Sequence, residues 1–180
     1  LVVGDSGMGK TTACAAILRH HIEAGAPGIV IKNEYIAAST TMAEALELEL
    51  RRQNSELEGG AGIKALSLST EEAPFLVLLE DLNRSDNPGG ILEKVIGWVL
   101  VEASKQQKDR RGAWRLVCPV WPRYLEVLEK RRDVFPVFNL AHLGRFTDEE
   151  GRWAVVKRAE AIGQAMDEHR AAAIAKSLGN

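Results

Sequence analysis

Short apolar runs alternate with longer amphipathic segments along the chain. Apolar runs of strand length, bounded by turn residues, predict strands over residues 1–3, 29–32, 63–68, 75–79, 114–120 and 134–140. Segments rich in helix formers, punctuated by Gly, Pro or polar residues, predict helices over residues 11–24, 41–53, 91–105, 123–132, 146–163 and 167–179. Because strand and helix alternate through most of the chain, we expect an α/β fold of three layers, a mostly parallel sheet flanked by helices.

The two final helices are not separated by a strand. We therefore predict a core over residues 1–145 and the start of a small helical subdomain over residues 146–180. Thr147, with Glu150 three residues later, matches the capping-box pattern at the first of these helices. Since the chain begins at Leu1 rather than Met and already reads as the end of a strand, we expect it to be part of a longer protein.

The loop after the first predicted strand, GDSGMGKT over residues 4–11, fits the pattern G-x-x-x-x-G-K-[ST] at every fixed position. Glycines let the backbone wrap a phosphate and present N–H groups at a helix N-terminus. Lys10 supplies a charge for the β- and γ-phosphates, the Thr11 hydroxyl is placed to ligate Mg²⁺, and Thr12 is expected near the α-phosphate. The alternative is a glycine-rich turn that only begins a helix.

This pattern predicts a P-loop NTPase that binds ATP or ADP with Mg²⁺. The guanine-specific pattern Asn-Lys-x-Asp is absent from the sequence, which favours ATP. The predicted nucleotide-binding residues are Gly4, Asp5, Ser6, Gly7, Met8, Gly9, Lys10, Thr11, Thr12 and Arg123.

The apolar run FLVLL ends in two acids, Glu80 and Asp81. A P-loop needs an acidic partner for its metal at the end of a neighbouring strand. We therefore expect Glu80 and Asp81 to hold Mg²⁺ with Thr11 and to act catalytically with Lys10. The order is Glu before Asp rather than the commoner reverse, so which carboxylate holds metal and which polarises water stays open. A solvated turn is the alternative.

Several arginines are candidates for sensing phosphate. Between the loop and residues 75–79 there is room for another strand, as in the additional-strand P-loop ATPases, where a residue on or just past the next strand often senses the γ-phosphate. Arg123 occupies that place after WRLVCPVW, and a surface arginine is the alternative. Arg84 follows the acids, and Arg110 and Arg111 in the polar run KQQKDRR are candidates for contacting a second protomer.

Four segments together resemble a STAND-type NTPase, the signalling ATPase group that includes NACHT and NB-ARC modules: GDSGMGKTT, FLVLLEDLNR, RLVCPVWPR and FNLAHLGRFTDEEGRWAVVKRA. The resemblance implies a switch that exchanges ADP for ATP, hydrolyses slowly and self-associates, with sensor and effector domains in flanking sequence. Two departures exist. Glu80 replaces the usual first Asp, and the strand ending CPVWPR lacks the Thr-Ser/Thr-Arg ending common in those modules.

Other functions compatible with the P-loop are another ASCE or AAA+-like ATPase, a scaffold that holds nucleotide without turnover, a small-molecule kinase and a DNA motor. A net charge of -2 and a pI near 6.1 argue against a dominant nucleic-acid surface, so direct nucleic-acid binding is not expected. The sequence contains neither an apolar stretch long enough for a membrane nor a visible secretory signal, so we expect no membrane partner and a cytoplasmic location.

Overall fold

The computed structural model describes residues 1–80, 82–106, 114–130 and 138–177. Within them every paired strand runs parallel to its neighbours. The strands are β1 Val2–Val3, β2 Gly28–Ile31, β3 Phe75–Leu79, β4 Trp114–Val117, β5 Pro119–Val120 and β6 Ala141–His142. Since parallel strands need crossovers, which here are mostly helical, this confirms the predicted α/β class with a parallel sheet.

The strands form two ladders, β2–β3–β4 and β5–β1–β6. A single residue, Cys118, separates β4 from β5, so one chain segment pairs with β3 through its first half and with β1 through its second half. The Val2 amide also donates to the Cys118 carbonyl at 2.9 Å. The segment 114–120 therefore lies between the strand that leads into the loop and the strand that precedes Glu80, whereas the earlier strand β2 pairs with the other side of β3.

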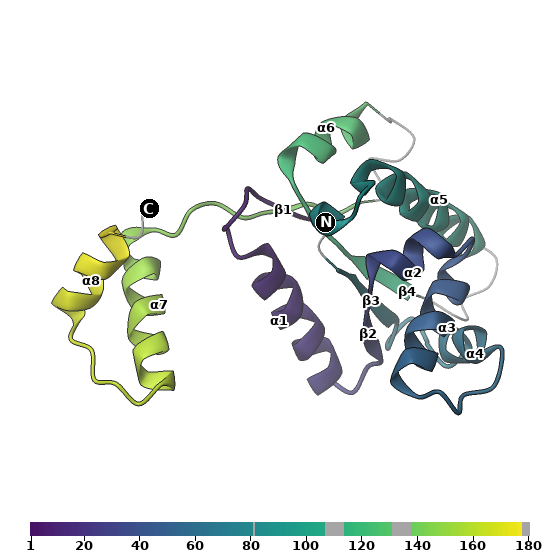
Figure 1. Cartoon of the computed structure of the whole chain (residues 1–180), viewed down its shortest axis with the longest axis horizontal. Coiled ribbons are helices and arrows are strands. Elements are labelled where there is room, and N and C mark those ends of the chain that lie inside the picture. Colours follow the sequence, from purple (N-terminus) through teal and green to yellow (C-terminus); the bar gives the residue numbers. More distant parts are fainter. Residues whose placement is uncertain (81, 107–113, 131–137, 178–180) are drawn as a thin grey trace. The chain divides into compact units, whose positions relative to one another are not determined.

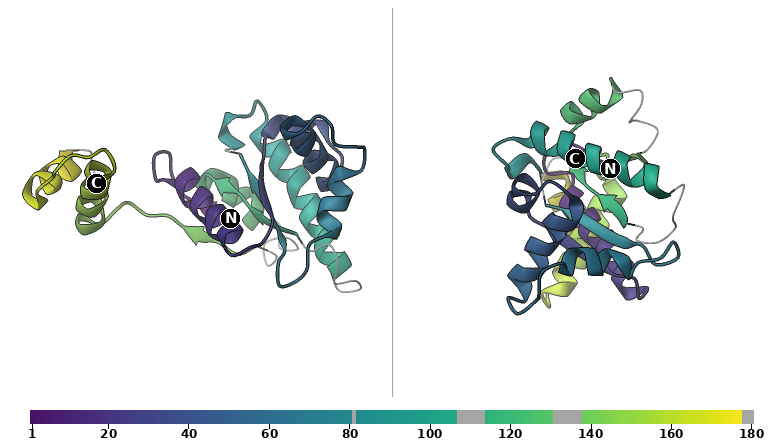
Figure 2. Two further views of the ribbon diagram at one scale, coloured as in Figure 1. Left: turned by 90° about the horizontal axis from the view of Figure 1, so that it is seen from below. Right: turned by 90° about the vertical axis from the view of Figure 1, so that its right-hand side faces the viewer.

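Helices flank the sheet on both faces, with α1 on one side and α2, α3 and α5 on the other (Figures 1 and 2). The helical elements are α1 Lys10–Glu23, α2 Asn33–Ala38, α3 Met42–Gln53, α4 Ala61–Ser67, the short 3₁₀ helix η1 Leu82–Arg84, α5 Pro88–Gln106, α6 Pro122–Glu129, α7 Asp148–Ala161 and α8 Glu168–Ser177.

The central strand β3 shows why both faces are covered. All five of its side chains are buried, and successive side chains point to opposite faces. Leu76 and Leu78 pack with Cys14 and Leu18 of α1 in a small cluster. The alternate residues of β3, Phe75, Val77 and Leu79, join the larger cluster formed with helices of the other face. The uninterrupted apolar run in the sequence is thus a strand buried from both sides.

Residues 63–68, predicted to form a strand, belong instead mainly to helix α4, and this prediction was wrong. The apolar residues at the two ends of the run are not buried: Ile63 is 67% exposed and Leu68 is 81% exposed. Gly62 explains the packing, since a Cβ there would lie 2.0 Å from the Ala43 carbonyl oxygen of α3. The close approach of two helix backbones, which hydrophobic spacing does not encode, defines this segment.

Two further expectations differ from the structure. Helix α2 follows β2 directly and was not predicted, because its six residues are too few for a helical pattern to stand out. The last strand was expected over residues 134–140, of which 134–137 lie outside the described residues. Residues 138–140 are not strand, and pairing with β1 begins at Ala141, whose amide donates to the Leu1 carbonyl at 2.9 Å.

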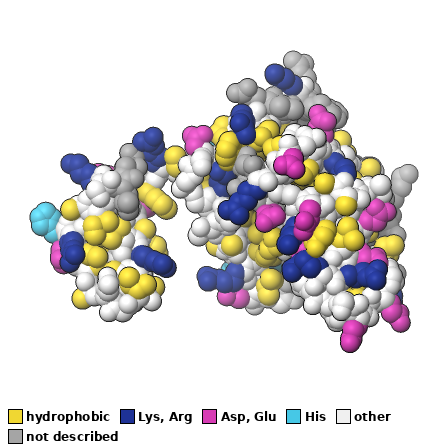
Figure 3. All heavy atoms as spheres, in the orientation of Figure 1, with side chains coloured by type: hydrophobic (Ala, Val, Ile, Leu, Met, Phe, Trp, Pro, Cys, Tyr) yellow, Lys and Arg dark blue, Asp and Glu magenta, His cyan; other side chains and the backbone are white. Residues whose placement is uncertain are grey.

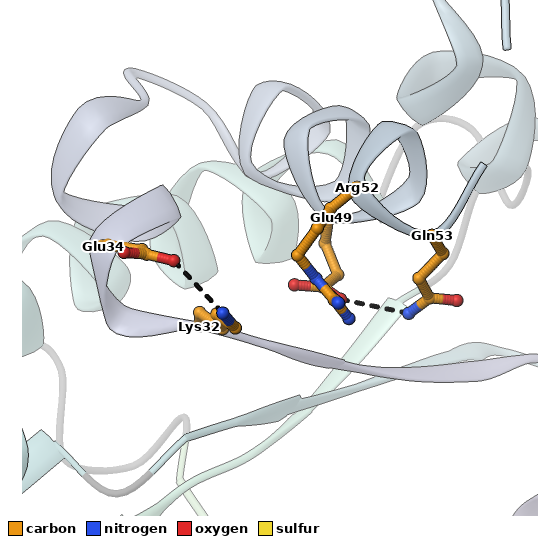
Figure 4. Close-up of polar contacts among 5 residues, drawn as sticks. All are labelled: Lys32, Glu34, Glu49, Arg52 and Gln53. Carbon is orange, nitrogen blue, oxygen red and sulfur yellow. Dashed lines mark hydrogen bonds and ion pairs between the residues drawn. The ribbon is translucent and has the colours of Figure 1, made fainter. Parts of the chain in front are cut away.

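Helix α3 carries a buried carboxylate, that of Glu49, beside Arg52 and Gln53 of the same helix (Figure 4). Glu49 is 1% exposed, and its Oε1 accepts hydrogen bonds from Arg52 Nε at 2.9 Å and Gln53 Nε2 at 3.0 Å. The pKa of Arg52 is raised, first by its hydrogen bond to Glu49 and then by the charge of that carboxylate. A buried charge is tolerated only when it is paired in this way.

Contacts divide the chain into two compact units, Leu1–Leu143 and Gly144–Asn180. The second unit is a pair of packed helices, α7 and α8, that buries mainly small residues such as Ala159, Ala171 and Ala175. The predicted capping box is confirmed, because Thr147 Oγ1 accepts from the Glu150 amide and the Glu150 carboxylate accepts from the Thr147 amide. Among the described residues, no helix has the length and apolar character needed to traverse a bilayer.

Candidate functional site

The loop of residues 4–11 leaves β1 and enters α1, as its sequence predicts. Gly7 and Gly9 have φ angles of 83° and 76°, a left-handed conformation that glycine adopts without steric cost. The Gly4 amide donates to the Val120 carbonyl at 3.2 Å, which ties the start of the loop to the end of β5. The two glycines therefore bend the chain back over the N-terminus of α1, the backbone shape that a phosphate cradle requires.

Lys10 is the buried cation of this loop. It is 7% exposed, and its Nζ donates a hydrogen bond to the Asp5 carbonyl oxygen at 2.7 Å. Burial of an ammonium group is costly unless its hydrogen bonds and charge are compensated. One neutral carbonyl leaves two N–H donors of this ammonium for an anion within the loop.

The N-terminus of α1 is open. Its N-cap is Gly9, no side chain accepts a hydrogen bond there, and the first turn contains no acidic residue. The first amides of a helix lack partners within the helix and carry the positive end of its dipole. Thr11 and Thr12 are exposed on this first turn, so their hydroxyls are accessible to a ligand seated on the loop. Backbone amides and one lysine together form an arrangement suited to an anion.

Arg123 lies next to this site, on the same aromatic side chain as Lys10. Trp121 is half-buried between β5 and α6, with the Arg123 Cζ 4.3 Å and the Lys10 Nζ 6.0 Å from the centroid of its ring. Arg123 Cζ is also 4.8 Å from the Tyr124 ring, and its Nη2 donates to the Tyr124 hydroxyl at 2.9 Å. The structure thus brings Lys10 and Arg123 to a single indole ring. A tryptophan between a strand end and the candidate arginine was the available sequence signal.

Glu80 follows β3 directly, is half-buried, and its amide donates to the Ile31 carbonyl at 3.0 Å. Its side chain lines a cleft of about 580 Å³ together with Lys32, Arg84 and Lys94. The Lys94 ammonium donates hydrogen bonds to three backbone carbonyls at the end of α2, those of Ile36, Ala37 and the C-cap residue Ser39. None of the described residues lining this cleft belongs to loop 4–11.

The separation of Glu80 from the loop follows from the strand order. Segment 114–120 lies between β3 and β1, so two strand spacings, about 10 Å, separate the two strands. Asp81, Arg110 and Arg111 lie outside the described residues, and Arg84 is exposed at the end of η1. No group of three or more His, Cys, Asp or Glu side chains suited to a metal occurs in the described part of the chain.

Charges on the surface are mixed in sign. In the space-filling view, basic and acidic side chains are interspersed over the first unit with apolar side chains between them (Figure 3). On this face no broad basic area is visible among the described residues. Beside the loop, Lys10, Arg123 and the α1 N-terminus bring positive charge together.

The fold, parallel strands flanked by helices on both faces, is shared with a protein of known structure. The chain is similar to the ORC2 protein of Aeropyrum pernix solved as ADPNP–ADP complexes, with a TM-score of 0.59 and 16% identity over 88% of this chain. It spans 45% of that protein's chain. The ADP form of the same protein aligns with a TM-score of 0.49 and 16% identity, over 89% of this chain and 46% of the other. No protein-family model matches the sequence, and no curated protein matches it.

Proposed function

We propose that this chain is an ATP-binding, slowly hydrolysing NTPase module that acts as a nucleotide-dependent switch in signalling or defence. The observation that carries the proposal is the buried ammonium of Lys10, held at the open N-terminus of α1 by a loop with two left-handed glycines. Such a site suits a polyphosphate, because backbone amides and a lysine together neutralise several negative oxygens.

The likeness to a protein solved with ADPNP and ADP supports a nucleotide as the ligand. Mg²⁺ suits the exposed Thr11 hydroxyl, an oxygen ligand of the kind that it prefers, and Glu80 would contact the ion only through water. When bound, the ion would neutralise charge on the phosphates. Because it normally keeps several waters, a carboxylate about two strand spacings away suits a water-mediated contact.

The switch itself extends the resemblance to STAND-type ATPases. A γ-phosphate and its metal order loops that collapse without them, which gives a protein two states. In this proposal the ATP state promotes self-association, flanking sensor and effector domains supply trigger and output, and the protein works in the cytoplasm. Glu80 and Asp81 would orient and polarise a water that attacks the γ-phosphorus; the bond to the β,γ-bridging oxygen breaks, ADP and phosphate leave, and the state is reset.

The first test compares wild type with Lys10→Ala, and with Lys64→Ala as a matched control. Lys64 is an exposed lysine of α4, so its loss removes the same charge without touching the loop. We expect Lys10→Ala to weaken ATP and ADP binding by about a hundredfold or more, with an unchanged circular dichroism spectrum. Retained ATP affinity in Lys10→Ala would overturn the proposal.

A second experiment separates slow hydrolysis from a scaffold that only holds nucleotide. Single-turnover hydrolysis of Mg-ATP is followed in wild type, Glu80→Gln and Asp81→Asn, with nucleotide affinity measured on the same preparations. We expect slow turnover in wild type and a loss of turnover with affinity retained in at least one variant. Absence of turnover in wild type would leave the scaffold as the function. The variant whose nucleotide affinity no longer depends on Mg²⁺ identifies the residue that holds the metal.

A further inference from the structure

The Trp121 ring lies within cation–π range of both Lys10 and Arg123. We propose that Trp121 is a positioning residue, which fixes Arg123 at a set distance from Lys10. The two cations then bind the phosphate chain of a nucleoside triphosphate together. This inference rests on the proposed function and deepens it, because it names the residue that separates triphosphate from diphosphate.

The distances define how far apart the two cations lie. Lys10 Nζ is 6.0 Å and Arg123 Cζ is 4.3 Å from the same ring centroid. The two groups are therefore at most about 10 Å apart, within the range of cation–π contact on both sides of the indole. A lysine and an arginine that ligate successive phosphates of one chain need a similar separation.

The chemistry of a stacked guanidinium suits this role. An arginine that lies on an aromatic face keeps its N–H donors in the plane of the group, pointing away from the ring. Among the described residues Arg123 donates one side-chain hydrogen bond, to the Tyr124 hydroxyl at 2.9 Å, and its other donors could serve phosphate oxygens. Holding the side chain between Trp121 and Tyr124 also lowers the entropy lost when it binds, which is pre-organisation.

The backbone places Trp121 in a fixed relation to the loop. Trp121 follows Val120, whose carbonyl accepts the Gly4 amide at 3.2 Å at the start of loop 4–11. Its own carbonyl accepts the Tyr124 amide at 3.0 Å, which begins α6 with Pro122 at the first position. The indole is thus anchored to the loop strand on one side and to the helix that carries Arg123 on the other.

The experiment measures ATP and ADP affinities by titration calorimetry for wild type, Trp121→Leu, Trp121→Phe, Arg123→Ala and the double variant Trp121→Leu/Arg123→Ala. We expect Trp121→Leu to weaken ATP binding about three- to tenfold and ADP binding less than twofold, because Trp121 positions Arg123, which we assign to the terminal phosphate, while Lys10 keeps its hydrogen bond to the Asp5 carbonyl. Trp121→Phe retains an aromatic face and should recover most of the loss. The double variant should bind no more weakly than Arg123→Ala, since Trp121 acts through Arg123.

Controls keep this inference separate from the proposed function. Trp153→Leu removes a cation–aromatic contact of the same kind, with Lys157 at 6.0 Å in α7, and should leave both affinities unchanged. Tyr124→Phe deletes only a hydroxyl and should weaken ATP alone by about twofold, which tests the idea even if Trp121→Leu does not fold. Equal losses for ATP and ADP, or additive losses in the double variant, overturn the positioning role. Nucleotide binding that survives Lys10→Ala overturns the proposed function instead.

Discussion

The two units of the molecule begin their leading helices in opposite ways. In the second unit, α7 starts at Thr147, whose side chain accepts the Glu150 amide, and the first turn carries three acids. In the first unit, α1 starts at Gly9 with no side-chain acceptor and no acid in its first turn. A helix that satisfies its own first amides gains stability, whereas one that leaves them open keeps a place for an anion. The difference suits α7 to a structural role, and the open end of α1 is the feature on which the proposed nucleotide site depends.

Closing the open end of α1 is the strongest test of this comparison. Thr12 is the third helical residue of α1, the position that Glu150 holds in α7, and it is exposed. We expect Thr12→Glu to weaken ATP binding about tenfold or more, because a built-in carboxylate occupies the amides and repels phosphate. Affinity is measured by calorimetry, with Thr12→Gln as the neutral control of equal length. Equal affinities in the two variants would show that the open helix end is not where phosphate binds.

Removing the cap of α7 is expected to change the stability of that helix, by a smaller factor than Thr12→Glu changes ATP affinity. Thr147→Ala removes the acceptor for the Glu150 amide and should cost about 1 kcal/mol of local helix stability. Amide hydrogen exchange over residues 147–161 should accelerate about fivefold, while exchange in α1 stays unchanged. Thr147→Ser, which keeps the hydroxyl, serves as the control. If exchange is as slow in Thr147→Ala as in wild type, the cap does not contribute to the stability of α7.

The stability of the first turn of α7 depends on pH, because the carboxylate of Glu150 forms part of its cap. Hydrogen bonds from the Thr147 amide, and then from its hydroxyl, hold the pKa of Glu150 below its ordinary value of 4.5. A carboxyl whose pKa is lowered on folding stabilises the folded state above its unfolded pKa and loses this contribution as the pH falls through the folded pKa. Protection of α7, corrected for intrinsic exchange, should thus be steady at neutral pH and decrease below about 4.5. Glu150→Gln should lack this decrease.

The ion pair between the two helices of the second unit should have the smallest effect. Arg152 Nη1 lies 3.3 Å from Glu168 Oε2, with side chains 39% and 79% exposed. Exposed pairs contribute little because water screens them, so Arg152→Ala should change exchange in α7 and α8 by less than about twofold. The Arg152→Lys variant is the matched control. A large change in exchange would mean that the ion pair, rather than capping and the packing of small residues, holds α7 and α8 together.

Sequence alone predicts the features of this molecule that depend on neighbouring residues. The loop of residues 4–11, the buried strand before Glu80 and the cap at Thr147 are all encoded within short windows, and the structure contains each of them. Helix α4 was mistaken for a strand because its path depends on contact between Gly62 and α3. The pairing of Lys10 and Arg123 through Trp121 depends on β1 and β5 lying side by side, which the order of residues does not display.

The pairing of β1 also bears on how the protein is made. Both neighbours of this strand, at residues 119–120 and 141–142, come more than a hundred residues later in the chain. At a synthesis rate of about 5–20 residues per second, the strand that leads into the loop waits roughly ten seconds on the ribosome before its first partner emerges. Non-local parallel pairing of this kind is slow to form. Completion of the phosphate cradle is therefore a late event in the life of the nascent chain, after β2 and β3 have already been translated.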